Sequence, residues 1–210
     1  MINGLIKAIA NLEEETTLRL VKEKIASGET PLEIVEQCRK GVEIVGKRYN
    51  EEIYYLSDLI MSEEIFRRVM EILEPHFPKN TNQNKYKLIM GTIEGDIHDL
   101  GKNIVINLLR SVGFEVRDLG VDVQPEDFVK CVKETGASII GISVLLTFSI
   151  NSVKKVMRLL EEAGLRDNMT VVIGGYPVNE RIREYTGADY YETDAVKAVE
   201  LFKRIIMEKE

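Results

Sequence analysis

KLIMGTIEGDIHDLGKN, residues 87–103, decides the fold of the larger part of this 210-residue chain. A short and mostly apolar run, 87–92, is followed by a polar loop and then, from about residue 102, by apolar residues at helical spacing. A buried strand that passes through a loop into a helix is the repeating element of proteins with a parallel sheet.

The same alternation continues to the C-terminus. We expect strands at 87–92, 115–119, 138–143, 170–174 and 189–191, with helices at about 102–112, 125–135, 151–163, 178–185 and 194–207. Gly113, Gly136, Gly164 and Gly187 each fall just past a predicted helix, where a left-handed cap is favoured. This pattern predicts an α/β domain with a doubly wound, flavodoxin-like parallel sheet. Ligands bind such sheets beyond the carboxyl ends of the strands, so the loops after Thr92, Leu119, Ser143 and Gly174 are candidate sites.

Residues 1–77 have helical periodicity and no convincing strand. A short helix at about 2–11 and three longer ones predict a four-helix bundle. Thr30 and Pro31 form a typical helix start, and Ser57 is a candidate cap for the last helix. The segment 74–84 has two prolines and a polar run, which is typical of a boundary. We therefore predict a helical domain at 1–77, a linker at 78–85 and an α/β domain at 86–210.

The composition restricts the possible functions. With 44% hydrophobic and 30% charged residues the chain is predicted to be globular, and its net charge of −7 disfavours binding to nucleic acid or an anionic membrane. No apolar stretch reaches membrane-spanning length and no signal peptide is evident, which predicts a cytoplasmic protein. Cys38 and Cys131 are predicted to be buried thiols, and the cysteines form no zinc or iron–sulfur pattern.

The loop after the first strand contains Asp96-x-His98-x-x-Gly101 and neither of the usual glycine-rich phosphate motifs. A histidine at the end of a first strand can face a ligand at the sheet edge. Asp96 could accept a hydrogen bond from the imidazole and fix its tautomer, as carboxylates do behind metal-bound histidines. The alternative is an ordinary exposed or capping histidine.

Two further loops offer suitable groups at the same edge, and Asp118 to Asp122 completes the rim. Ser143-Val144-Leu145-Leu146-Thr147-Phe148-Ser149 supplies three hydroxyls, although these could equally be turn residues or, for Ser149, a helix cap, as could Asn151. Gly174-Gly175 would let a bulky planar group approach the backbone, but paired glycines also occur in ordinary turns.

Together, Asp96-x-His98-x-x-Gly101 with Lys102-Asn103, Ser143-x-Leu145 and Gly174-Gly175 resemble the cobalamin-binding domain of methionine synthase and of the corrinoid proteins of methyltransferase systems. That family also places a four-helix bundle before this domain, so the resemblance covers nearly the whole chain. Size and domain order look most like the separate corrinoid proteins of methylamine, methanol and methoxy-aromatic demethylation.

The resemblance implies a set of site residues. His98 would be the lower axial ligand of cobalt in place of the cofactor's own dimethylbenzimidazole, with Asp96 and Ser149 as a relay behind it. The nucleotide tail would enter a slot between the sheet and a helix. The slot would be lined by Gly101, Ser143, Leu145, Gly174 and Gly175, and Gly95, Asp99 and Thr147 would complete the contacts.

In the helical domain, the resemblance implies that Tyr55, Leu59 and Met61 cap the methyl-bearing face of the cofactor. The alternative is that these residues belong to the core of the bundle. The linker at 78–85 would let the cap move aside for partner proteins.

The resemblance further implies a methyl carrier with three kinds of partner: a substrate-specific methyltransferase, an acceptor methyltransferase that uses tetrahydrofolate or a thiol, and a reductive activator of the corrinoid. Three alternatives remain. These are the cobalamin subunit of a carbon-skeleton mutase, a cobalamin-dependent sensor or transcription regulator, and a flavodoxin-like nucleotide- or flavin-binding module. The acidic residues 1–30 are too short for a helix-turn-helix, which disfavours a regulator.

Overall fold

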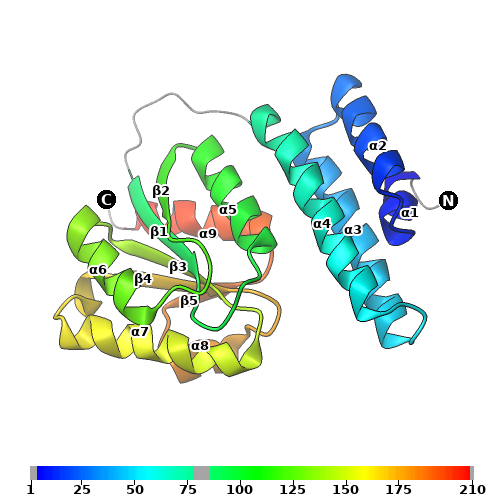
Figure 1. Cartoon of the computed structure of the whole chain (residues 1–210). Coiled ribbons are helices and arrows are strands. Elements are labelled where there is room, and N and C mark those ends of the chain that lie inside the picture. The colour runs from blue at the N-terminus through cyan, green and yellow to red at the C-terminus, as the bar shows by residue number, and fades with distance from the viewer. Residues whose placement is uncertain (1–3, 78–85, 209–210) are drawn as a thin grey trace. The chain divides into compact units, whose positions relative to one another are not determined.

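The computed structural model describes residues 4–77 and 86–208 and divides the chain into two units, Met1–Phe77 and Pro78–Glu210. The predicted linker at 78–85 lies outside the described residues. The N-terminal unit consists of helices, and the C-terminal unit alternates strands with helices (Figure 1).

The N-terminal unit is a four-helix bundle, as predicted. Its helices are α1 (Gly4–Ala10), α2 (Glu14–Ala26), α3 (Pro31–Asn50) and α4 (Leu56–Leu73), and a short 3₁₀ turn, η1 (Glu74–His76), follows. Fully buried side chains from all four helices form its core, among them Leu5, Ile9, Val21, Ile34, Val45, Ile65 and Leu73. Gly41 lets α3 approach α1, because a Cβ there would lie 2.7 Å from Cβ of Ile9.

The helix starts show one correct and one wrong prediction. Thr30 caps α3 through a reciprocal capping box with Glu33, with Pro31 at the first helical position. Ser57 does not cap α4: the helix begins after Tyr55, whose backbone N–H donates to Asp58 Oδ2 at 2.7 Å. The carboxylate at the third helical position satisfies this end, and Ser57 lies within the first turn.

The predicted boundary segment also begins too early. Residues 74–76 form η1, and Phe77 is buried at 7% exposure. Phe77 is therefore a buried residue of the helical unit and not part of an exposed linker.

The C-terminal unit contains a five-stranded parallel sheet in the order β2-β1-β3-β4-β5, which confirms the doubly wound, flavodoxin-like fold. The strands are β1 (Tyr86–Thr92), β2 (Phe114–Asp118), β3 (Ile139–Ser143), β4 (Thr170–Gly174) and β5 (Tyr190–Glu192). The helices are α5 (Leu100–Ser111), α6 (Pro125–Thr135), α7 (Ile150–Glu162), α8 (Glu180–Thr186) and α9 (Ala195–Met207). The four glycines predicted to end helices all have positive φ.

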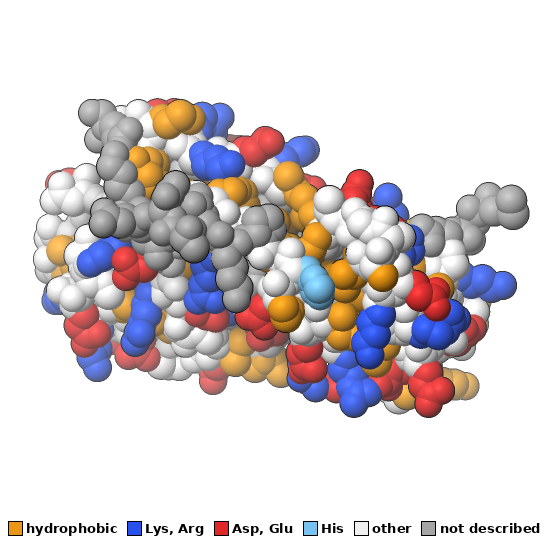
Figure 2. Space-filling model, turned by 90° about the horizontal axis from the view of Figure 1, so that it is seen from above, with side chains coloured by type: hydrophobic (Ala, Val, Ile, Leu, Met, Phe, Trp, Pro, Cys, Tyr) orange, Lys and Arg blue, Asp and Glu red, His pale blue; other side chains and the backbone are white. Residues whose placement is uncertain are grey.

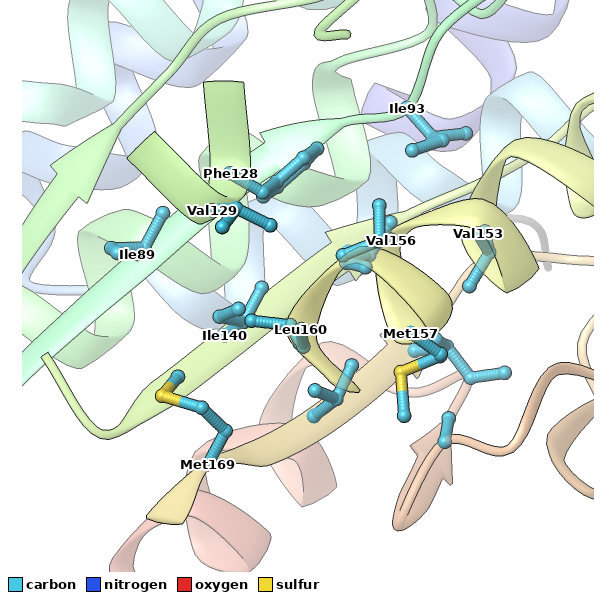
Figure 3. Packing of buried hydrophobic residues seen from close by; sticks show 14 of the residues in the cluster. Ile89, Ile93, Phe128, Val129, Ile140, Val153, Val156, Met157, Leu160 and Met169 are labelled. Atoms are coloured by element: carbon cyan, nitrogen blue, oxygen red, sulfur yellow. The ribbon is translucent and has the colours of Figure 1, made fainter. Parts of the chain in front are cut away.

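Helices cover both faces of the sheet. On one face α6 and α7 pack against the central strands, and Figure 3 shows Phe128, Val156 and Leu160 in one cluster with the strand residues Ile89 and Ile140. On the other face α5 and α9 pack against the alternate residues of the same strands, including Leu88, Met90 and Val172. Because residues of a strand alternate between faces, the two clusters use opposite sides of β1, β3 and β4.

The register brings three predicted loops to one edge. Thr92 pairs with Ser143, and Ser143 pairs with Gly174, so the loops after β1, β3 and β4 begin side by side. The chain reverses its direction of winding between β1 and β3, and ligands of doubly wound folds bind at such a point. A candidate site is therefore defined by the topology.

Surface and thiol chemistry are consistent with a globular protein. Figure 2 shows acidic and basic side chains interspersed over the visible face. Cys38 and Cys131 are free and buried, as predicted. Within residues 4–77 and 86–208, no helix is long and apolar enough to span a membrane.

Candidate functional site

Asp96 lies at the centre of the site and is completely buried. Its Oδ1 accepts the backbone N–H of His98 at 3.0 Å and lies 2.8 Å from His98 Nδ1. Its Oδ2 accepts the backbone N–H groups of Leu145 and Leu146. One carboxylate therefore fixes the histidine and joins the β1 loop to the β3 loop.

These contacts also determine the charge of Asp96. Burial raises the pKa of a carboxyl group, but hydrogen bonds from the backbone of His98 and Leu145, from the imidazole and from the backbone of Leu146 outweigh it. The net effect holds the pKa of Asp96 below its usual value. The group is thus an anion that accepts hydrogen bonds from every neighbour.

The predicted contact between Asp96 and His98 is formed. Because an ionised carboxylate can only accept, the facing Nδ1 must carry the proton, which leaves the lone pair on Nε2. The His98 side chain is 41% exposed. A fixed, accessible imidazole with a free Nε2 is the form in which histidine binds a metal.

The predicted relay to Ser149 is not formed in this structure. Ser149 is buried and its Oγ has no hydrogen-bond partner, whereas Asp96 uses its oxygens for His98 and the two β3-loop amides. Ser149 precedes α7 and its side chain makes no capping bond. Ser149 therefore has an unused hydrogen-bonding group beside the site. Burying a hydroxyl without a partner costs free energy.

A turn of the β2 loop supports the His98 loop. Gly95 has φ +80°, and its N–H donates to Asp122 Oδ1 at 2.7 Å. The Asp122 N–H in turn donates to the carbonyl of Asp96 at 3.0 Å, and Asp122 itself has φ +52°. This positive φ in a non-glycine residue marks a tightly constrained turn.

A polar network fixes the start of α5. Asp99 precedes the helix and its carboxylate accepts Asn103 Nδ2 at 2.9 Å. Lys102 Nζ, almost fully buried, donates to Asn103 and to both oxygens of Asp118 at 2.8–2.9 Å. The network therefore joins the His98 loop to the end of β2.

A cavity of about 110 Å³ lies between the sheet and helices α5 and α9. Four of the five predicted slot residues line it, namely Gly101, Ser143, Gly174 and Gly175, and Leu145 does not. The remaining lining was not predicted: Met90, Lys102, Val105, Gly141, Ile142, Val172, Ile173, Glu192, Thr193, Asp194, Ala195, Ala198 and Phe202. Gly141, in the middle of β3, was the signal in the sequence for this part of the lining, because a glycine within a strand often marks a site where a ligand or another backbone comes close.

The fold itself requires glycine at the end of β4, both at Gly174, the last residue of the strand, and at Gly175 after it. Gly175 has φ +125°, and a Cβ there would lie 1.9 Å from the carbonyl oxygen of Val144. A Cβ on Gly174 would lie 2.9 Å from the carbonyl of Glu192. In contrast, a Cβ on Gly101 would meet nothing within 4 Å, so of these three glycines Gly101 alone borders open space.

Exposed apolar side chains surround the loops at this edge. The backbone N–H of Leu145 donates to Asp96, but the residue is 37% exposed. Thr147 is also exposed. Sequence reasoning missed Ile97, Phe148 and Tyr176, which are 68%, 69% and 90% exposed. Large apolar residues in loops after strands were the signal for them, because clustered exposed apolar side chains mark binding surfaces.

The helical unit has a comparable exposed apolar surface at the start of α4. Tyr55 is 74% and Met61 49% exposed, so the alternative that they belong to the bundle core is wrong. Leu59 is half-buried, and Leu56 and Ile60 beside them are exposed.

Comparison with known proteins now identifies the family. Residues 86–200 match one family model described as a B12 binding domain, and residues 1–74 match a second with the same description. The chain belongs to the B12-binding family. Its cofactor is therefore cobalamin, vitamin B12.

Several relatives of this B12-binding protein are similar over nearly its whole length. It is 36% identical to a dimethylamine corrinoid protein of Methanosarcina barkeri, covering 98% of this chain and 97% of that protein. A solved structure of the monomethylamine corrinoid protein of the same organism has 33% identity and a TM-score of 0.89, covering 97% of each chain. The methanol:cobalamin methyltransferase complex of Methanosarcina barkeri has 28% identity and a TM-score of 0.57, covering 98% of this chain and 79% of that one.

The residues present fit this cofactor. The site offers one imidazole nitrogen with a free lone pair, an apolar cavity bordered by Gly101 and an apolar rim. Among residues 4–77 and 86–208 no group of three or more histidine, cysteine or acidic side chains could hold a metal ion. The donor set fits cobalt that enters with its corrin ring and needs one protein ligand.

Proposed function

We propose that this protein is a corrinoid methyl carrier that binds cobalamin with its dimethylbenzimidazole base detached and His98 as the lower axial ligand. The observation that carries the proposal is the pair formed by His98 Nδ1 and the buried Asp96. Because this hydrogen bond uses Nδ1, Nε2 of the partly exposed imidazole is left free to bind a metal ion.

Cobalamin, when bound, supplies a cobalt ion that accepts a methyl group from one partner and releases it to another. His98 would provide the protein ligand, and Asp96 would hold the proton on Nδ1 so that the Nε2 lone pair is left for cobalt. Asp96 is itself held by the backbone of the β3 loop, which fixes the acceptor that orients the imidazole. We further propose that the Ser149 hydroxyl, which has no partner in this structure, hydrogen-bonds to that carboxylate when cobalamin is bound.

We assign the other contacts by chemistry. The nucleotide tail would occupy the cavity beside Gly101, Ser143 and Gly174. The exposed apolar rim, with Leu145, would contact the corrin ring together with Gly95, Asp99 and Thr147 of the surrounding loops. Tyr55, Leu59 and Met61 would shield the methyl-bearing face, which explains why an apolar surface on the helical unit is exposed.

The names of the relatives support methyltransferase partners. One solved relative is a methanol:cobalamin methyltransferase complex, and others are methylamine corrinoid proteins. We infer that a substrate-specific methyltransferase charges this carrier and that an acceptor methyltransferase, acting on tetrahydrofolate or a thiol, discharges it. A reductive activator would restore oxidised cobalt.

The ligand assignment is tested with His98→Ala. Reconstituted with cobalamin, this variant should show the visible spectrum of cobalt without a protein imidazole. His76→Gln is a matched control, because His76 is the only other histidine and lies in η1 of the helical unit. An unchanged spectrum for His98→Ala would disprove the assignment.

The carrier function is tested by the alkyl group on cobalt. The holo-protein purified from its host should release a methyl group on photolysis. Release of an adenosyl group would indicate radical chemistry and contradict a methyl carrier.

A further inference from the structure

The cavity beside Gly101 has a polar mouth and an apolar floor. In the register of the sheet, Ser143 and Gly174 form the row at the strand ends. Two residues further in, and on the same face, Met90, Gly141 and Val172 form the next row. Val105 of α5 and Ala198 and Phe202 of α9 complete the inner walls.

The charged groups around the cavity are already hydrogen-bonded. The ammonium of Lys102 makes three hydrogen bonds, to Asn103 and to both oxygens of Asp118. At the mouth, Glu192 accepts two backbone N–H groups, and Asp194 caps α9 by accepting two more. None of these side chains belongs to the inner row, where the only polar side-chain atom is the thioether sulfur of Met90, a weak acceptor.

The open part of the cavity lies beside Gly101, where an added Cβ would meet nothing within 4 Å. At Gly141 the place of a side chain is already filled by Met90 and Phe202, whose atoms lie 3.1–3.4 Å from an added Cβ, so apolar side chains form the floor. An apolar cavity of about 150 Å³ binds benzene, so one of about 110 Å³ that is open at its mouth suits the inner ring of a bicyclic base.

We propose that this cavity selects cobamides by their nucleotide base, accepting a base with a hydrocarbon six-membered ring and rejecting a purine. This inference rests on the proposed function, in which the nucleotide tail enters the cavity. The ribose is attached to the five-membered ring, so the six-membered ring goes deepest. In dimethylbenzimidazole that ring carries only methyl groups. In adenine it carries an amine and two ring nitrogens, which would lose their hydrogen bonds to water against Met90, Val172 and Phe202.

Two cobamide analogues test this selection with the full-length apo-protein. One carries p-cresol and the other adenine. In neither does the base form a strong bond to cobalt, so neither loses such a bond on entering the protein. By isothermal titration calorimetry we expect the adenine analogue to bind at least tenfold more weakly, as unpaired polar groups in an apolar pocket imply. Equal affinities, or tighter binding of the adenine analogue, would overturn the inference.

Variants locate the selection within the cavity. Met90→Gln and Val172→Thr add hydrogen-bonding groups to the floor and should reduce the preference for p-cresol several-fold. Met207→Gln, at an exposed position of α9, should leave it unchanged. Val172→Thr preserves the side-chain shape and serves if Met90→Gln does not fold. An unchanged preference in a folded floor variant would overturn the assignment to this cavity.

Cobinamide, which lacks the nucleotide, distinguishes a failure of base selection from a failure of the proposed function. Binding of cobinamide together with equal affinities for both analogues would overturn base selection and leave the proposed function standing. If neither the analogues nor cobinamide bind, the proposed function fails and the inference fails with it.

Discussion

Asp96 has more hydrogen-bonding partners in the site than His98, and they are mostly backbone groups. Removing its carboxylate leaves the N–H groups of Leu145 and Leu146 without an acceptor. We therefore predict that Asp96→Ala lowers the free energy of unfolding of the apo-protein by about 1–3 kcal/mol. His98→Ala removes a single partner from a half-exposed position and should cost less than about 1 kcal/mol.

Urea unfolding of the two variants without cofactor measures this difference. If His98→Ala were the more destabilising of the two, Asp96 would not be the structural centre of the loop.

Glycine is required at position 175 by the backbone conformation, whereas at position 101 its absent side chain leaves space in the cavity. Gly175→Ala would force a Cβ against the Val144 carbonyl at positive φ, so we expect a loss of about 3 kcal/mol or failure to fold. Gly101→Ala adds a methyl group where nothing lies within 4 Å, in the first turn of α5. It should leave stability unchanged or raise it by up to about 1 kcal/mol, and weaken cobalamin binding by narrowing the cavity.

Thermal unfolding and cobalamin titration of both variants test this contrast. A stable, fully binding Gly175→Ala protein would contradict the conformation of the β4 loop.

At the scale of helices and strands, the buried thiol of Cys38 makes the stability of the helical bundle depend on pH. Burial in α3 raises the pKa of this thiol to about 12. Between about pH 9 and 12 the unfolded chain loses this proton and the folded chain retains it, so stability must fall as pH rises. The expected contribution is about 1.4 kcal/mol per pH unit within that window, and none below it.

The test compares unfolding of wild type and Cys38→Ala at pH 8 and pH 10. The substitution changes stability at both values, but wild type should lose more stability between them. Parallel losses would mean that the thiol ionises equally in both states.

Elements with clear terminal residues were predictable from sequence. Helix α6 has its predicted bounds because Pro125 begins it and Gly136 ends it with φ +67°. The start of α4 was not, because Ser57 has the chemistry of a cap while the bond that closes the end comes from Asp58. Local preference identifies candidate capping residues, but it does not decide which of two neighbouring residues closes the helix end.

The site shows the same limit over longer distances. Asp96 and His98 are two residues apart, and their hydrogen bond followed from the motif. The Lys102 to Asp118 pair and the inner row of the cavity depend on strand register and on two helices packed on one face. Spacing along the chain does not contain that information.

The whole molecule has two units, each with its own core. We predict that the apo-protein unfolds in two resolved transitions. Cobalamin at a hundred times its dissociation constant should stabilise the α/β unit by about 2.7 kcal/mol, because the ligand binds only the folded state.

Differential scanning calorimetry with and without cobalamin measures both transitions. A single transition without cofactor would show that the two units unfold as one.

The most direct test of the central claim is electron paramagnetic resonance of the Co(II) holo-protein. The chain contains only two histidines, so labelling with ¹⁵N-histidine in a His76→Gln background marks His98 alone. With His98 as the lower ligand, the nitrogen splitting of the cobalt signal should change from a triplet to a doublet. A triplet that persists after labelling would show that dimethylbenzimidazole is still coordinated and would contradict ligation by His98.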